Sequence, residues 1–237
     1  MPRATDPTEF TGFADPKFFK ELAKHQTREW FSANKAMYDM GFAKPMQLLL
    51  DELVQKLDRS FPDCELGAGK VFRIHRDVRF SKDKSPYKTH VAGMIPVRIG
   101  SGKITETPAA MYLQVGCDAD GKPSHMAGAG LYLMDKVQLE KYRAAVLDAK
   151  KGGELAKLVS ALVKKGASIE AGEVLKNPPR GVDPEHPRSE LLKKKGLVAM
   201  YEGIPAATLK SRELVAQLAE RGKAMAPLVR WLAWNTR

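Results

Sequence analysis

The sequence predicts an α+β protein in which a central, mostly antiparallel sheet is packed by helices from both ends of the chain. The hydrophobic period is helical over about 15–61 and 135–237, and it changes to two over about 70–134. With 43% hydrophobic residues among 237, the chain can bury a substantial core. We therefore expect a single domain over 1–237, with a loop near 177–188 and a short extra strand near 197–201.

Three helices are expected before residue 61. Asp15 followed by Pro16 is typical of a helix start, because an acid caps free amides and proline fits the first helical position. A second helix is expected to begin near Thr27, and Pro45 opens a third. The apolar stripes of these helices are expected to be core: Phe18, Phe19, Leu22, Trp30, Phe31, Tyr38, Leu49, Leu50, Leu53, Val54 and Leu57.

The middle of the chain predicts several antiparallel strands, at about 71–80, 94–99, 110–115 and 128–134. The segment Asp118-Ala-Asp-Gly121 opens like a calcium loop but has Ala129 where the twelfth-position glutamate should stand, so it predicts a hairpin turn. Gly67-Ala-Gly-Lys70 is not a Walker A loop, because Val71 follows where a serine or threonine is needed.

The last third returns to helix. Asp135 and Gln138 form a predicted capping box for a helix through Ala149, and further helices are expected over 153–165 and from about Ser211. The run of lysines at 193–195 is best explained as a helix C-terminus closed by Gly196, since cations favour that end of the helix dipole.

The chain is basic, with a net charge of +11 and a pI of about 9.6. The charge is uneven: residues 71–90 hold six Lys/Arg against two acids, giving +4, and residues 141–237 hold 19 against ten, giving +9. A field of this sign favours phosphate-bearing small molecules, nucleic acids or anionic surfaces as partners.

The segment 71–90 carries the strongest functional signal. Its first ten residues alternate, so that Phe72, Ile74, Val78 and Phe80 would face a core while Arg73, His75, Asp77 and Arg79 face the other way. Arg76 does not fit the alternation. Either a bulge turns it outward or it is buried and paired with Asp77 or a more distant acid.

Turn residues follow, with lysines and a tyrosine that could stack on a base or anchor the loop. We predict an anion-binding strand and loop, because arginine suits planar oxyanions. Alternatively, Asp77 and Asp83 neutralise their neighbours in a salt-bridge network. The candidate ligand-binding residues are Arg73, His75, Arg76, Asp77, Arg79, Lys82, Lys84, Tyr87, Lys88 and His90.

No cofactor or metal site is predicted. Cys64 and Cys117 are too few for a disulfide framework or a typical zinc site, and the five histidines lack metal-ligand spacing. The N-terminus lacks the apolar core of a signal peptide, and no apolar run is long enough to span a bilayer. We therefore expect a cytoplasmic protein.

Several motifs resemble the bacterial and fungal family known as domain of unknown function 2461. They are Arg28-Glu-Trp-Phe31 with Asn34, Lys35 and Tyr38, the run from Arg73 to Lys88, Gly128 to Tyr132, and Pro179-Arg-Gly181. The resemblance implies no activity, ligand or catalytic residue, because none is established for the family. Gln114 departs from the pattern, since many relatives have histidine there, and this weakens any scheme with a catalytic histidine on that strand.

Three functions remain open at this level. The segment could hold a phosphate-bearing ligand, with salt-sensitive affinity. It could serve an enzyme acting on a phosphoester, with His75 and His90 as acid and base and arginines stabilising charge. It could also be an internal network of a structural or partner-binding protein, centred on Arg76 and Asp77. We favour the first.

Overall fold

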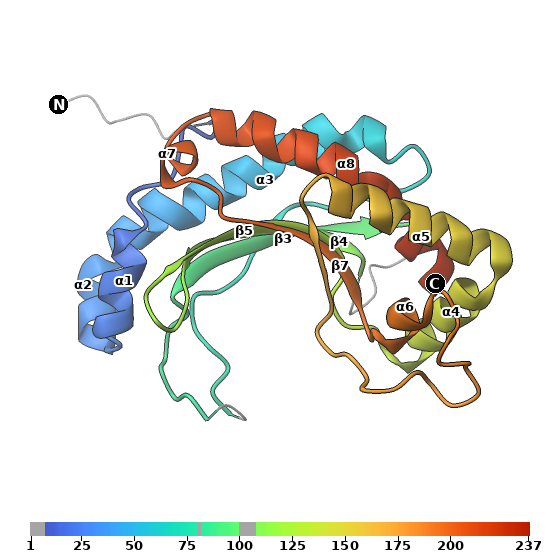
Figure 1. The fold of residues 1–237 in the computed structure, drawn as a ribbon. Helices are drawn as coiled ribbons and strands as arrows, with labels where there is room; N and C mark the ends of the chain where they lie inside the picture. The colour runs from blue at the N-terminus through green and yellow to red at the C-terminus, as the bar shows by residue number, and fades with distance from the viewer. Residues whose placement is uncertain (1–7, 80–81, 100–107) are drawn as a thin grey trace.

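The computed structural model describes residues 8–79, 82–99 and 108–237, and it has a seven-stranded antiparallel sheet with helices stacked on one face (Figure 1). This architecture confirms the predicted α+β class. The strand order is β1-β3-β4-β5-β7-β6, and β2 also pairs with β3. The strands are β1 (Glu65–Leu66), β2 (Lys70–Val71), β3 (His90–Arg98), β4 (Ala110–Cys117), β5 (Pro123–Leu131), β6 (Ser168–Glu170) and β7 (Leu197–Glu202).

The helices begin where the capping residues of the sequence place them. Asp15 accepts a hydrogen bond from the Lys17 amide (3.0 Å), and Thr27 accepts one from the Trp30 amide (3.2 Å). The helices are α1 (Lys17–Lys24), α2 (Arg28–Tyr38), α3 (Lys44–Leu57), α4 (Lys136–Leu147), α5 (Ala149–Lys164), α6 (Ser189–Lys193), α7 (Ala206–Leu209) and α8 (Glu213–Thr236). A π-helical turn (Asp39–Ala43) joins α2 to α3, and a 3-10 turn (Asp58–Ser60) follows α3.

The two faces of the sheet differ in burial. Helices α3 and α8 cover one face, where alternate strand residues such as Val91, Ile95, Leu113 and Val115 are buried. On the other face, which we call the open face, no described helix lies across the middle of the sheet (Figure 1). The alternate residues there include several half-buried side chains: His90, Met94, Tyr112, Gln114, Ser124 and Met126. The open face is therefore where β3, β4 and β5 can meet a ligand.

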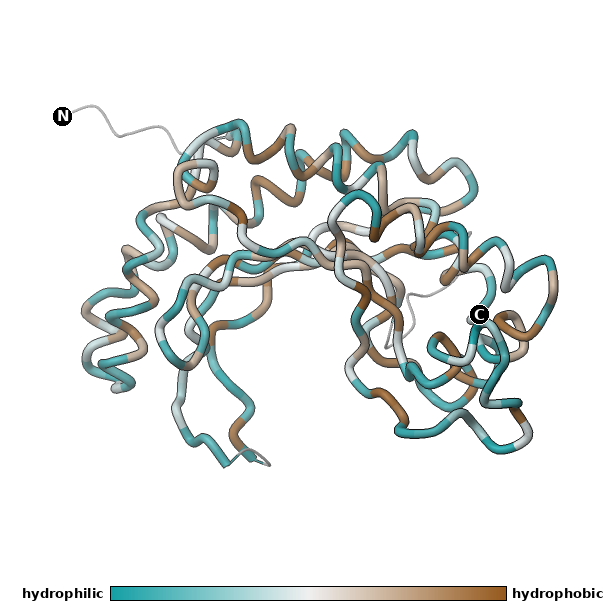
Figure 2. The backbone as a smooth tube through the Cα atoms, in the orientation of Figure 1, coloured by the Kyte–Doolittle hydropathy of each residue, from teal (hydrophilic) through white to brown (hydrophobic). Residues whose placement is uncertain are grey.

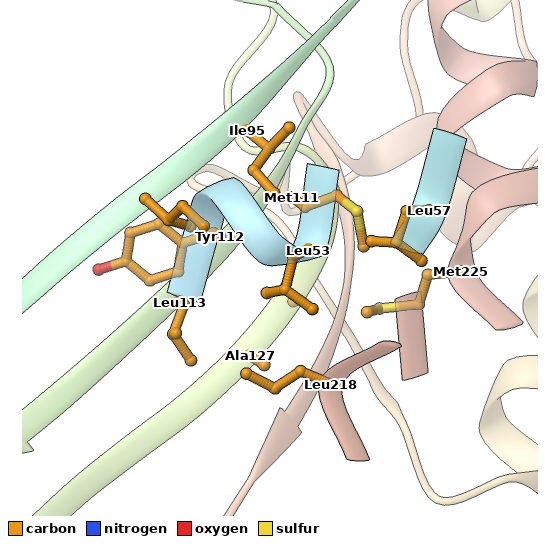
Figure 3. A pocket seen from close by; sticks show the side chains of 11 residues that line it. Leu53, Leu57, Ile95, Met111, Tyr112, Leu113, Ala127, Leu218 and Met225 are labelled. Atoms are coloured by element: carbon orange, nitrogen blue, oxygen red, sulfur yellow. The ribbon is translucent and has the colours of Figure 1, made fainter. Parts of the chain in front are cut away.

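A small void lies between the sheet and its helices (Figure 3). It measures about 20 Å³ and is lined by apolar side chains of α3, α8 and the central strands. A space of this size holds about one water molecule, so it is a packing defect rather than a ligand site. Tyr112 is among the residues around it, and its hydroxyl points away from Leu57 and Met225 (Figure 3).

The structure corrects several boundaries. The predicted strand at 71–80 is regular only at Lys70–Val71, and Phe80 lies outside the described residues. The helix expected through Ala149 ends at Leu147, because Asp148 caps the next helix by accepting a hydrogen bond from the Lys151 amide (2.7 Å). The capping box of Asp135 and Gln138 is confirmed. Strands β1 and β6 were not predicted.

The glycine after the lysine run has a different reason from the expected helix cap. Helix α6 ends at Lys193, as the charges indicated, but Gly196 does not have the left-handed conformation of a helix-closing glycine. A Cβ at Gly196 would lie 2.0 Å from the Tyr132 carbonyl oxygen. The close approach of two chain segments therefore requires the glycine.

No helix among the described residues combines the length and apolar character that crossing a bilayer requires.

Candidate functional site

The cationic segment forms a hairpin that leaves the sheet between β2 and β3. We call residues 72–89 the cationic hairpin; its arms are joined by a bridge between His75 and Tyr87 and by the hydrogen bond from the Arg76 amide to the Pro86 carbonyl (2.9 Å). Figures 1 and 2 show it projecting below the sheet as a mainly hydrophilic loop. A regular strand does not form there because no neighbouring strand accompanies the arms beyond the edge of the sheet.

Aromatic packing anchors the hairpin to helix α2. The Tyr87 ring is 4% exposed and stacks on Phe31, with centroids 4.4 Å apart, and the His75 ring lies 5.2 Å from that of Tyr87. The Tyr87 amide also donates to the Gln26 side chain (3.1 Å). Tyr87 therefore serves as an anchor, and its buried ring offers no free surface for stacking on a base.

Three cationic side chains and a histidine lie where the hairpin joins the open face. We call Arg73, Arg76, Lys88 and His90 the base cluster. Burial lowers the pKa of Lys88, and the like charge of Arg73 lowers it further. Burial, Lys88 and Arg76 together lower the pKa of His90 to about 4, so His90 is neutral at pH 7. Among the described residues, neither Arg73 nor Lys88 forms an ion pair with a carboxylate.

The charges toward the tip of the hairpin are paired. Arg79 forms a two-pronged ion pair with Asp77 (3.0 and 2.7 Å), and these bonds lower the pKa of Asp77. Arg76 pairs with Asp83 (2.5 Å), whose pKa is lowered first by its hydrogen bonds from Ser85. Both acids predicted as neutralising groups are therefore used in that way.

The two lysines near the tip complete the segment. Lys84 donates to the Val78 carbonyl (2.8 Å), and Lys82 is exposed. Arg76, which did not fit the alternation, is 31% exposed at its side chain, so it is neither fully buried nor free in solvent. Its partner is Asp83 rather than Asp77.

Aromatic and amide side chains of the open face adjoin the base cluster. The Lys88 ammonium lies 5.6 Å from the centroid of the Phe72 ring, and that ring lies 6.4 Å from the ring of Tyr112. The Tyr112 hydroxyl donates to Gln114 (2.6 Å), and Gln114 donates to Ser124 (2.8 Å). Burial raises the pKa of Tyr112 to about 12, with Tyr132 a second cause.

The sequence identified the cations of this site but not its other members. Phe72 was expected in the core and instead is half-buried beside Lys88. Tyr112 and Gln114 were not proposed as site residues. These two residues alternate with the apolar Met111, Leu113 and Val115, and this alternation indicates that Tyr112 and Gln114 share one face of the sheet.

The two histidines that the acid–base scheme would use have different neighbours. His75 packs on Tyr87 and Phe31, whereas His90 lies beside Lys88 and Arg76. Gln114 lies on the open face, paired with Ala92, two residues along β3 from His90. In the described part of the chain, no three His, Cys, Asp or Glu side chains are grouped to hold a metal ion.

The second basic region lies largely in the helical layer or is paired. Helix α5 carries four of its lysines and packs beside α8 on the covered side of the sheet (Figure 1). Lys193 pairs with Glu190 and Lys195 with Glu173, each at 2.6 Å. These groups therefore do not extend the base cluster into one continuous cationic surface.

The fold and the hairpin together define an α+β protein with a cationic corner on the open face of an antiparallel sheet. A family model described as a conserved hypothetical protein, domain of unknown function 2461, matches residues 15–231. The chain belongs to this family, as the motifs around the hairpin indicated. Searches of curated proteins and of solved structures give no significant match.

Proposed function

We propose that this protein is an anion-binding module that holds a phosphate-bearing ligand in the base cluster. The observation that carries the proposal is the crowding of like charges: Arg73 acts on Lys88, and Lys88 and Arg76 act on His90. The two nearby acids, Asp77 and Asp83, are already bonded to Arg79 and Arg76. Arg73 and Lys88 have no carboxylate partner among the described residues, so a bound anion would offset the repulsion between these two cations.

A phosphate suits the chemistry of the cluster. Arginine presents a planar fork of donors to tetrahedral oxyanions, and lysine adds a point charge. The neutral imidazole of His90 can donate one further hydrogen bond. Because a bound dianion favours the protonated imidazole, binding should raise the pKa of His90.

The first experiment measures phosphate affinity by calorimetry, at low and at moderate salt, for the wild type, Lys88→Gln and Lys84→Gln. The two variants lose the same charge from the same hairpin, but only Lys88 belongs to the base cluster. We expect at least a tenfold loss of affinity for Lys88→Gln, less than a twofold loss for Lys84→Gln, and weaker binding at higher salt. Equal losses in both variants, or no binding by the wild type, would contradict the proposal.

A structural or partner-binding role is the second candidate, and the paired tip of the hairpin favours it. Arg79 with Asp77 and Arg76 with Asp83 could hold the tip in a shape that a partner recognises. This role predicts that Arg76→Ala destabilises the protein while phosphate has no effect on its unfolding temperature. An effect of phosphate that depends on Lys88 favours the anion-binding module instead.

A further inference from the structure

The base cluster continues into an aromatic surface on the open face. The contacts run from Lys88 to the ring of Phe72 and from that ring to Tyr112, at centroid distances of 5.6 and 6.4 Å. Both rings are half-buried, so each keeps some surface toward the open face. Rings in such a position can pack against a flat, apolar or aromatic part of a ligand.

An amide lies beside these rings with unused hydrogen-bonding capacity. Gln114 accepts one hydrogen bond from Tyr112 and donates one to Ser124. A glutamine amide has two donor hydrogens and two acceptor lone pairs, so one of each remains. Because its two partners fix the amide plane, the free donor and acceptor present a fixed pattern, which matches the edge of a nucleobase.

The distance between the base cluster and the Gln114 amide is close to the length of one nucleotide sugar. Gln114 pairs with Ala92, and His90 pairs with Gly116, so the two side chains are two residues apart in register on the same face. Residues separated in this way lie about 7 Å apart along a strand. The sugar of a nucleotide bridges a comparable distance between its phosphate and its base.

We propose that the ligand is a mononucleotide, with its phosphate in the base cluster and its base against Phe72, Tyr112 and Gln114. This inference rests on the proposed function and names the class of molecule that carries the phosphate. A single nucleotide fits better than a strand of nucleic acid, because the other lysine-rich region lies in the helical layer or is paired.

The test compares ligands that share a phosphate and differ in the base. Affinities for AMP, UMP, ribose 5-phosphate and inorganic phosphate are measured by calorimetry for the wild type, Tyr112→Leu and Tyr112→Phe. The wild type should bind at least one nucleotide ten or more times as tightly as ribose 5-phosphate. Tyr112→Leu should reduce this ratio to about threefold or less, whereas Tyr112→Phe, which keeps the ring, should stay within about threefold of the wild-type ratio.

The outcomes separate this inference from the proposed function. Equal affinity of the wild type for nucleotides and ribose 5-phosphate overturns the mononucleotide and leaves the phosphate site intact. If a twelve-nucleotide RNA displaces AMP and binds more tightly than AMP, the mononucleotide is also overturned, in favour of a strand of nucleic acid. A folding control, the unfolding temperature of each variant without ligand, identifies a loss of structure. If Tyr112→Leu does not fold, Gln114→Leu replaces it with the same expected loss of the nucleotide preference.

Discussion

The base and the tip of the cationic hairpin both carry cations, but only the tip contains acids, Asp77 and Asp83. At the tip, Arg79 and Arg76 are each bonded to an aspartate, and the acids have lowered pKa values. At the base, burial lowers the pKa values of Lys88 and His90, and neighbouring cations lower them further. A count of lysines and arginines therefore does not locate an anion site. The positions of the acids determine which cations remain available to a ligand.

Loss of the buried aromatic ring that anchors the base of the hairpin should have the largest effect on stability. Tyr87→Ala removes a buried ring that stacks on Phe31, and we expect it to lower the free energy of unfolding by about 3 kcal/mol, measured by urea denaturation. Tyr87→Phe keeps the ring and should remain within about 0.5 kcal/mol of the wild type. A loss below about 1 kcal/mol for Tyr87→Ala would show that the base is held by other contacts.

The charge crowding at the base predicts a pH-dependent stability. Well above pH 6.5, His90 is neutral in both the folded and the unfolded chain. As the pH falls toward 4, His90 of the unfolded chain binds a proton, whereas His90 of the folded protein stays neutral. The free energy of unfolding should fall across this window, and a pKa that changes from 6.5 to about 4 corresponds to about 3 kcal/mol at most. Below pH 4 the contribution of His90 no longer changes.

Comparison with His90→Gln isolates this contribution. The variant keeps His125, whose pKa is also lowered by burial, and it keeps all the carboxylates that titrate in acid. Its stability should therefore depend less steeply on pH between 6.5 and 4 than that of the wild type. Identical slopes, in urea denaturation series over this range, would mean that the pKa of His90 is not lowered in the folded protein.

Disturbing the close backbone contact at Gly116, beneath the base cluster, should have a smaller effect on stability. A Cβ at Gly116 would lie 2.3 Å from the Thr89 carbonyl oxygen and 2.4 Å from the His90 Cα. Gly116→Ala must push β3 and β4 apart at this pair, and we expect a loss of about 2 kcal/mol together with weaker phosphate binding. Gly153→Ala is the control, since that position in α5 has open space; its stability should be unchanged or higher.

Breaking the tip should have the smallest effect on stability. Arg76→Gln, Asp83→Asn and the double variant form a cycle around an ion pair whose side chains are 31% and 51% exposed. Solvent and salt screen such a pair, so all three unfolding midpoints should agree within the error of thermal denaturation. A coupling of several degrees would make the tip an architectural element and favour the partner-binding role.

The alternation of residues 72–79 was predictable from sequence, although the regular strand was not. Ile74 is buried and Arg73, His75, Asp77 and Arg79 are exposed, as a period of two requires. A strand needs a hydrogen-bonding neighbour, and sequence pattern does not reveal where the edge of a sheet lies. The arms therefore alternate like strands but form only one bridge.

The candidate site could be predicted only in part, because its members come from separate strands. Arg73, Arg76, Lys88 and His90 stand in one charged run, which sequence inspection detects. The sequence does not show which of these cations forms an ion pair, because that depends on which acid each side chain can reach. Arg76 reaches Asp83, seven residues away, rather than the adjacent Asp77. The aromatic and amide side chains join the site through the pairing of β3 with β4.

By itself, the sequence determined the α+β class, the helix starts, the family and the density of positive charge. These features depend on local patterns: hydrophobic periods, capping residues and runs of one charge. Only the tertiary structure decided that Asp77 and Asp83 pair with Arg79 and Arg76, that Lys88 lies beside Phe72, and that Phe72 lies beside Tyr112. Those contacts depend on strand register and hairpin direction, which arise from packing and pairing between distant residues rather than from local sequence.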